Sequence, residues 1–375
     1  MTTLYEIIVA SAEAALALQG KDGAMPAGHN GPYHDPETPV RDTAHWLVTF
    51  LKAWELEGDR RFVGAAQKAV TYLLGEQARP MGATFWHRTN PEKDFCNGLV
   101  GQAWTIEALA LAATALGDER CRQVGEAVFL LHPFDERLGV WRRVAVDGSY
   151  LSFDMTFNHQ LWFAAAGSLL LPAAGAAVAG RVHRFLDALP QNMALYDSGL
   201  IRHPLILPAA SVAPVSWKGR VARLFRSPGG RDPNEAKLYA KAIGYHTFNL
   251  YALAILRQQT PEHPVWRWSR LPEIIAYVDR KDFWAELDDN KYGYPYNPPG
   301  FEAPFARHVF ADLAKGADTQ QVEVWVDLQL RRCFNRESRL MELRTEDPVT
   351  HAARLYEATR LPDVPVHLAS GEVQA

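Results

Sequence analysis

Residues 39–74 have the sequence PVRDTAHWLVTFLKAWELEGDRRFVGAAQKAVTYLL, and this stretch decides the fold. An apolar, aromatic-rich segment runs to a turn at Gly58-Asp59, and a second segment with a one-sided apolar stripe follows it. The pattern predicts a buried helix paired with an external helix. It recurs at residues 96–131, 157–190 and 244–278, which indicates an internal repeat of helical hairpins.

Two weaker copies follow at residues 301–334 and 347–362, and the last copy lacks its second helix. A helix expected at about residues 4–18 has no partner of its own and can complete that copy, which closes the array into a ring. We therefore predict an all-α fold, an (α/α)6 barrel or toroid of six helical hairpins, with long loops and short β-hairpins on one face. In this prediction residues 1–375 form a single domain, and the helix at about residues 4–18 packs against the last inner helix at about residues 347–360.

The composition excludes several classes of protein. A net charge of −4 gives no electrostatic basis for binding nucleic acid. The three cysteines, Cys96, Cys121 and Cys333, are too scattered for a disulfide framework or a thiolate zinc site, so we expect buried packing residues in a reducing compartment. The first residues lack the basic start of a secretory signal, and a cytoplasmic location is expected. Because HExxH, GxSxG and glycine-rich phosphate motifs are absent, we expect no metal and no cofactor.

Unusual polar residues recur at the start of each predicted inner helix. They are Asp42 and His45, Asn97 and Gln102, Asp154 with Asn158 and His159, Tyr245 with His246 and Asn249, Glu302 with His308, and Asp347 with His351. In a ring these helix starts converge on one opening, which we call the mouth of the ring. The unpaired backbone N–H groups there favour binding of anions and hydroxyl-rich ligands. A carboxylate at a helix start is also the usual N-cap, so capping and catalysis both remain open for Asp42, Asp154 and Asp347.

The loops that precede these helices are long and rich in aromatic and polar residues. They span residues 22–38, 80–94, 138–153 and 282–301, and the third alternates like a β-hairpin around the turn Asp147-Gly148. Connections on the opposite side are minimal, as at Gly117-Asp118. This asymmetry indicates that function lies at the mouth.

Residues 199–231 carry no acidic residue and six basic ones. Within this segment residues 217–226, from Trp217 to Arg226, predict a helix with one apolar face among the basic residues. Peripheral contact with an anionic membrane, a lid over an anionic substrate and a solvated basic loop all remain open.

The pattern resembles the six-hairpin, (α/α)6-toroid, glycosidase-like superfamily over nearly the whole chain. The pair Arg41-Asp42 in PVRDTAHW looks like the Arg-Asp pair with which some inverting members grip a sugar. Two short segments, LYDSGLIRHP at residues 195–204 and GYHTFNLYALAIL from Gly244, are similar to the helical domain of uronyl C5-epimerases. The resemblance implies a carbohydrate-active enzyme.

On this basis we predict a metal-independent glycoside hydrolase that acts on an oligo- or polysaccharide, including one that contains uronate. Inverting hydrolysis needs a proton donor and a carboxylate base held about 6.5–9.5 Å apart. The candidate catalytic residues are Asp42 and Asp154, with Glu302 and Asp289 behind them. The candidate substrate-binding residues are Arg41, His45, Trp46, Trp86, Arg88, Gln102, Asn158, His159, Trp162, Arg202, Tyr245, His246, Asn249, Tyr294 and His351.

Three alternatives stay open at this point. In a uronyl C5-epimerase or polysaccharide lyase, Tyr245, His246, Tyr196 and Arg202 would replace the carboxylate pair. A non-catalytic toroid would bind a glycan or a lipid-linked glycan and leave it unchanged. A terpene cyclase-like activity through Asp288 and Asp289 is the most distant of the three.

Overall fold

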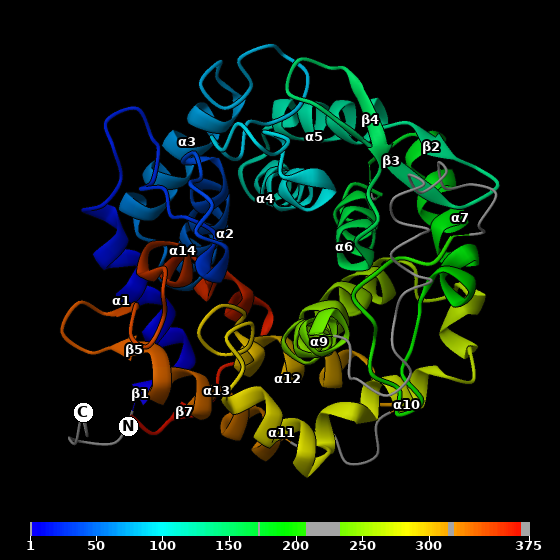
Figure 1. Cartoon of the computed structure of the whole chain (residues 1–375). Helices are drawn as coiled ribbons and strands as arrows, with labels where there is room; N and C mark the ends of the chain where they lie inside the picture. Colours follow the sequence, from blue (N-terminus) through cyan, green and yellow to red (C-terminus); the bar gives the residue numbers. More distant parts are fainter. Residues whose placement is uncertain (1, 172, 208–232, 314–318, 369–375) are drawn as a thin grey trace.

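The computed structural model describes residues 2–171, 173–207, 233–313 and 319–368, and these form a ring of helical hairpins (Figure 1). The inner helices are α2 (Val40–Glu57), α4 (Gly98–Leu116), α6 (Phe157–Ser168), α9 (Pro233–Gln259), α12 (Pro299–Val309) and α14 (Pro348–Ala353), which continues as the 3-10 helix η5 (Arg354–Arg360). The outer helices are α1 (Leu4–Leu16), α3 (Arg60–Leu74), α5 (Glu119–Leu131), α7 (Ala176–Asn192), α10 (Leu271–Ala276), α11 (Lys281–Asp288) and α13 (Thr319–Cys333). The predicted all-α toroid is confirmed.

The division into inner and outer helices follows the apolar pattern of each segment. Inner helix α4 is buried along nearly its whole length, whereas outer helix α3 buries one stripe that includes Phe62, Ala66 and Leu73. The turn between α2 and α3 is as short as predicted. Gly58 ends α2 in the left-handed conformation, and the Asp59 carboxylate caps α3 by accepting a hydrogen bond from the Arg61 N–H at 2.8 Å.

The fourth hairpin differs from the prediction of one continuous outer helix. After α9 the chain forms the 3-10 helix η3 (Pro264–Arg267), α10, the 3-10 helix η4 (Tyr277–Asp279) and α11. Prolines explain the breaks, because Pro264 and Pro272 lack the N–H that a helix interior needs and stand in the first turns of η3 and α10.

The two ends of the described chain meet and close the ring. Strand β1 (Thr2–Thr3) pairs antiparallel with β7 (Pro365–Val366), and the Leu4 N–H donates to the Val364 carbonyl at 2.9 Å. The Tyr5 hydroxyl donates to the Leu361 carbonyl at 3.2 Å, just after η5. Helix α1 therefore lies against the last inner segment, beside α2 (Figure 1).

The strands are short and belong to the loops. Strands β2 (Phe134–Asp135), β3 (Val140–Val144) and β4 (Tyr150–Phe153) form one antiparallel sheet, with Gly148 at φ 87° in the predicted turn. Strands β5 (Phe334–Asn335) and β6 (Leu340–Met341) form a second hairpin. The described part of the chain thus places strands only between helices or at the ring closure.

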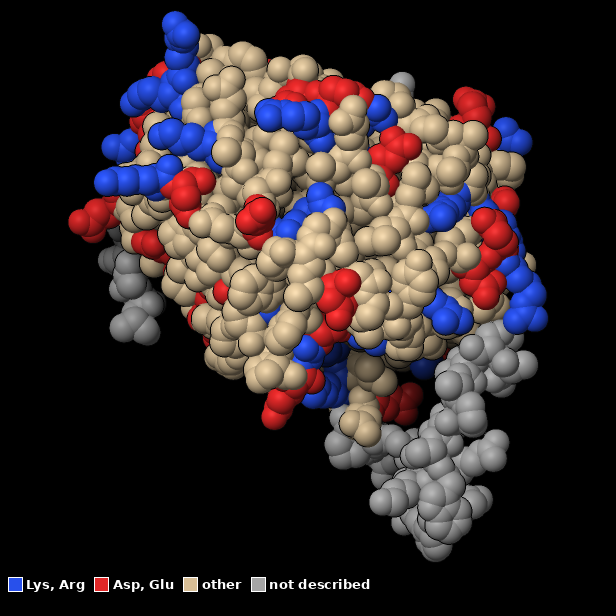
Figure 2. Space-filling view, turned by 90° about the horizontal axis from the view of Figure 1, so that it is seen from above, with Lys and Arg blue, Asp and Glu red and all other residues tan. Residues whose placement is uncertain are grey.

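All three cysteines are free and buried, as expected of packing residues. Among the described residues one helix, α4, is long and apolar enough to cross a membrane, but 72% of its apolar window is buried inside the ring. On the face drawn in Figure 2, basic and acidic side chains are interspersed. Residues 217–226, on which the predicted membrane contact rests, lie outside the described residues.

Candidate functional site

A cavity of about 200 Å³ lies between α4, α6 and α9, under the loops that lead into α2, α4 and α12. Its lining combines amide, aromatic, imidazole and cationic side chains: Asn30, Tyr33, Arg88, Lys93, Asn97, Val100, Trp104, Thr156, Asn158, His159, His203, Lys241, Tyr245, Phe248, Tyr296 and Asn297. Convergent polar groups on an aromatic wall are typical of sites for small polar ligands. The cavity lies at the predicted mouth of the ring.

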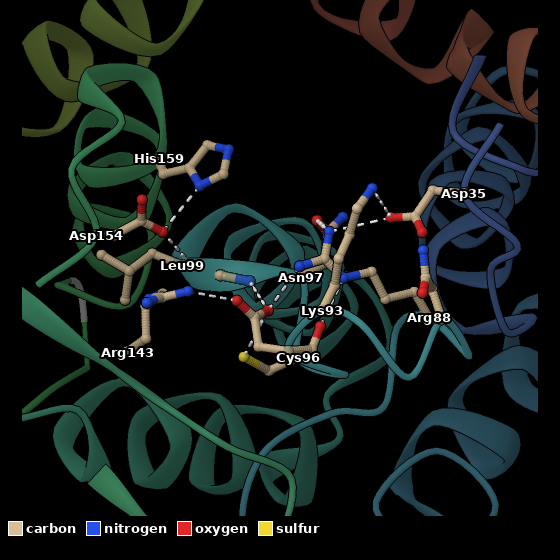
Figure 3. Close-up of polar contacts among 12 residues, drawn as sticks. Asp35, Arg88, Lys93, Cys96, Asn97, Leu99, Arg143, Asp154 and His159 are labelled. Carbon is tan, nitrogen blue, oxygen red and sulfur yellow. Dashed lines mark hydrogen bonds and ion pairs between the residues drawn. The ribbon is translucent and has the colours of Figure 1, made fainter. Parts of the chain in front are cut away.

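His159 lines this cavity, and the Asp154 carboxylate pairs with it (Figure 3). The Asp154 carboxylate accepts hydrogen bonds from the backbone N–H groups of Leu99 and Thr156, at 3.1 and 3.2 Å, and lies 2.8 Å from His159 Nδ1. Burial by itself raises the pKa of Asp154, but the His159 ring and these hydrogen bonds bring it down to about 2. The carboxylate is therefore ionised at neutral pH, and His159 Nδ1 must be the donor to it. His159 lines the cavity, and this pairing uses Nδ1 and not its other ring nitrogen, Nε2.

A glycine allows the start of α4 to approach this pair. Asn97 and Gly98 both have positive φ, 53° and 59°. A Cβ atom on Gly98 would lie 2.5 Å from Asp154 Oδ2 and 2.9 Å from His159 Nδ1. A side chain at this position would have to displace the Asp154 carboxylate or the His159 ring and would be strained at this positive φ, so glycine is favoured here.

A second imidazole, His203, faces the same cavity from the segment that follows α7. Its carbonyl accepts a hydrogen bond from the Phe157 N–H at 3.0 Å, which fixes this segment to the first residue of α6. Burial, followed by the charge of Lys241, lowers the pKa of His203 to about 3. His203 is therefore neutral at physiological pH and can donate one hydrogen bond and accept another.

A cluster of phenols also lines the cavity, and the Tyr245 ring lies 5.4 Å from the ring of His203. The hydroxyls of Tyr33 and Tyr245 are 2.8 Å apart, and the Tyr296 hydroxyl donates to Asn30 Oδ1 at 2.7 Å. Burial raises the pKa of both Tyr33 and Tyr245 far above the usual range, so both keep their protons. Arg41 supports this wall from behind: its Nη1 donates to Asn30 Oδ1 at 2.9 Å.

The rim near α4 is held by ion pairs. Arg88 Nη1 lies 3.1 Å from Asp35 Oδ2, and its Nη2 lies 2.9 Å from Asp94 Oδ1. The Lys93 ammonium lies 3.1 Å from the same Asp35 oxygen. Arg143, which belongs to strand β3, places its Nη1 2.5 Å from Asp94 Oδ2 (Figure 3). These cations are therefore neutralised by the protein's own carboxylates.

The predicted catalytic carboxylates occupy other places. No Asp or Glu among the described residues lines this cavity. Asp42 is buried, accepts hydrogen bonds from the Gly28 N–H at 3.2 Å and the Thr350 hydroxyl at 3.4 Å, and has its pKa raised well above the usual range, mainly by burial. Glu302 is 3.0 Å from the buried Arg354 guanidinium. Asp289 ends α11 and lines a separate groove.

Four of the predicted binding residues line the cavity, namely Arg88, Asn158, His159 and Tyr245. The remaining ones do not: Arg41, His45, Trp46, Trp86, Gln102, Trp162, Arg202, His246, Asn249, Tyr294 and His351. Several have structural partners. Gln102, for example, hydrogen-bonds the Phe85 N–H and carbonyl at 2.8 and 3.0 Å, and His246 Nε2 lies 3.0 Å from the Ile274 carbonyl. A role for these residues in binding stays a prediction.

The sequence prediction left out two cavity residues that matter for chemistry, His203 and Lys241. His203 stands inside the segment that resembles uronyl epimerases, so that similarity could have identified it. Lys241 precedes the repeat copy that begins at Gly244, and no pattern in the sequence sets it apart from other lysines. The described residues also contain no group of three or more His, Cys, Asp or Glu side chains arranged to hold a metal ion.

No protein family model matches the chain. Among curated proteins it is similar to the archaeal glycosylation protein Q of Haloferax volcanii, with 50% identity over 379 residues, which covers 98% of this chain and 100% of that protein. Similarity at this level extends over the whole ring, so the two chains share their fold and their family.

Solved structures with the same fold include several carbohydrate-active enzymes. Cellobiose 2-epimerase from Spirochaeta thermophila has a TM-score of 0.62 and 16% identity, and the match covers 92% of each chain. A D-mannose isomerase has a TM-score of 0.63 and 15% identity, with 94% of this chain and 96% of that chain covered. The α-1,6-mannanase GH76A from Salegentibacter sp. has a TM-score of 0.57 and 13% identity, with 95% and 98% covered. These enzymes establish the six-hairpin glycosidase-like fold of the chain.

Proposed function

Because the chain belongs to the family of the archaeal glycosylation protein Q, we propose that it is a sugar epimerase or isomerase that acts in glycan processing. One observation carries the choice of chemistry: two imidazoles, His159 and His203, line the cavity, and no carboxylate among the described residues does. Imidazole is suited to moving a proton at a carbon atom near neutral pH. This proposal favours the epimerase, an alternative that the sequence left open, over the predicted hydrolase.

In the proposed mechanism His159 Nε2 removes a proton from a sugar carbon next to a carbonyl or carboxyl group. Ionised Asp154 holds Nδ1–H and stabilises the charge that forms on the ring. The electron pair of the broken C–H bond moves into an enolate, whose oxygen accepts a hydrogen bond from neutral His203 or from the protonated Tyr245. Delivery of a proton to the opposite face of the same carbon gives the epimer. Delivery to the neighbouring carbon, with the hydroxyl proton moving to the former carbonyl oxygen, gives the isomer, so that no atom is gained or lost in either case.

The same geometry disfavours the hydrolase. A glycoside hydrolase needs a carboxyl group that donates a proton and a carboxylate that activates water, both beside the scissile bond. Asp154 lies behind His159, and with its pKa at about 2 it holds no proton to donate at neutral pH. Hydrolysis remains the second candidate for one reason: burial raises the pKa of Asp42, and its Oδ1 has no hydrogen-bond partner within the described parts of the chain, which suits a proton donor. It would require the loop whose Gly28 N–H binds Asp42 to rearrange.

The test is incubation with neutral and uronate-containing oligosaccharides in D2O, read by proton NMR and mass spectrometry. We expect deuterium at a sugar carbon without new reducing ends. His159→Gln should abolish the incorporation, and Asp42→Asn should leave it within about threefold of the native rate, because Asp42 does not line the cavity. New reducing ends that disappear in Asp42→Asn would replace our proposal with the hydrolase. Binding with no change in any sugar would instead support a non-catalytic toroid.

A further inference from the structure

We propose that Lys241 forms a subsite for an anionic substituent on the bound sugar, either a carboxylate or a phosphate. The inference rests on the proposed function only in taking the cavity as a sugar site. It names the class of substrate, a negatively charged sugar, and the residue that selects it.

Lys241 differs from the other cations of the cavity in having no ion partner among the residues that the structure describes. Arg88 and Lys93 are both paired with Asp35, and Arg88 is also paired with Asp94. Among the described residues no carboxylate lies within ion-pair distance of Lys241, although the side chain is half-buried and lines the cavity. A half-buried ammonium without a counter-ion is costly, and a bound anion would relieve that cost.

The surroundings of Lys241 strengthen this preference. Its Nζ lies 4.9 Å from the centre of the Tyr33 ring and 5.7 Å from that of Tyr292, so aromatic faces hold the ammonium in place at the cavity wall. Burial, and after it the charges of Lys237, Lys291 and Lys93, lowers the pKa of Lys241 to about 8. The like charges that surround Lys241 create a positive potential, which an anionic group on the substrate would offset.

Other titratable groups near Lys241 do not neutralise it. Tyr33 keeps its proton, and His203 is held neutral. Glu286 and Asp289 line an adjoining groove of about 600 Å³ together with Lys237, Lys291 and Tyr292, but neither acid forms an ion pair with Lys241. Because Tyr292 borders that groove and lies under the Lys241 ammonium, the anionic substituent would sit where the cavity adjoins the groove.

Equilibrium binding of three ligands, measured by calorimetry at fixed ionic strength and pH 7, tests the inference without any turnover. The ligands are a neutral methyl hexoside, the matching methyl hexuronide and the matching hexose 6-phosphate. We expect the native protein to bind at least one charged ligand roughly 10- to 100-fold more tightly than the neutral one, as for a charge-assisted hydrogen bond. The charged ligand that is preferred identifies the substituent.

Lys241→Met keeps the length of the side chain and removes its charge, so it should remove this preference while binding the neutral hexoside as before. Lys241→Arg should retain most of the preference. Lys68→Met, which removes an exposed charge on outer helix α3, is the matched control and should match the native protein.

Equal affinity for neutral and charged ligands in the native protein, or an unchanged preference in Lys241→Met, would overturn the inference. Either result would leave the proposed function standing if deuterium still enters a sugar. Conversely, a Lys241-dependent preference without deuterium incorporation would sustain the subsite and overturn the epimerase.

Discussion

Replacing Asp154 with asparagine is the most direct test of the aspartate–histidine pair. The native carboxylate accepts hydrogen bonds from two backbone N–H groups and from His159 Nδ1, and only 6% of its side chain is exposed. An asparagine has one acceptor oxygen for these donors, and its amide N–H₂ group must face at least one of them. We therefore expect Asp154→Asn to fold but to lose both stability and activity.

The magnitude follows from the pKa of Asp154, which falls from its ordinary value of 3.8 to about 2 on folding. At 1.36 kcal/mol for each pKa unit, this is a stabilisation of roughly 2–3 kcal/mol. A carboxylate whose pKa is lowered by folding stabilises the protein above the pKa of the unfolded chain, and this contribution disappears as the pH falls toward the folded pKa. The stability difference between native protein and Asp154→Asn should therefore be greatest near pH 7 and vanish as the pH approaches about 2.

Urea denaturation at several pH values measures this difference, with the exposed Asp197→Asn as a control that should match the native protein throughout. The rate of deuterium incorporation should fall by roughly 10²- to 10⁴-fold in Asp154→Asn, the usual range for loss of general acid–base catalysis. The reason is tautomeric: an amide N–H₂ facing Nδ1 would move the ring proton of His159 to Nε2, which then cannot accept a proton from the substrate. A stability loss that does not change with pH, or a normal rate of incorporation, would refute the reasoning.

Three further predictions follow from other contacts. Gly98→Ala and Gly58→Ala should each lower the free energy of unfolding by roughly 1–2 kcal/mol, because both glycines have φ near +60°. Only Gly98→Ala should also lose activity, because its Cβ would meet the carboxylate of Asp154. Equal activity of the two variants would contradict the close packing described above. Arg354→Met should destabilise the protein by roughly 3–5 kcal/mol in urea denaturation, because it leaves the buried Glu302 and Glu357 without their cation. A loss below about 1 kcal/mol would argue against this buried ion network. Binding of a charged sugar should weaken as the pH rises through about 8, where Lys241 loses its proton, whereas binding of a neutral sugar should not. Parallel pH profiles of affinity for the two sugars would contradict a role for the Lys241 charge in binding.

Much of the fold could be predicted because it depends on the local periodicity of apolar residues. The apolar stripes, the Gly58-Asp59 turn and the Asp147-Gly148 hairpin depend on neighbours in the sequence, and each is present in the structure. Proline breaks in the fourth outer helix were missed because the repeat pattern suggested a regular partner for α9. The sequence also predicted the side of the ring on which this cavity lies, through the long loops that precede the inner helices.

The individual site residues were harder to predict, because a carboxylate at a helix start has the same appearance in the sequence whether it caps, pairs or catalyses. Asp347 caps α14 through the Thr350 N–H and binds the backbone of His29. Asp154 stands two residues before Thr156, the N-cap of α6, but pairs with His159 of α6 and accepts a hydrogen bond from the Leu99 N–H of α4. The sequence could name both as candidates but could not distinguish them.

The sequence by itself therefore determined the closed ring of hairpins and the side of the ring on which polar residues gather, because these depend on the period and order of apolar segments. Only the tertiary structure decided which polar groups face the cavity and which are hydrogen-bonded or ion-paired inside the protein. Asp42 accepts a hydrogen bond from the backbone of Gly28, His203 lines the same cavity as His159, and Lys241 has no carboxylate partner among the described residues. The physical reason is that pairing of buried charges is settled by contacts between residues far apart in the chain, which no local pattern encodes.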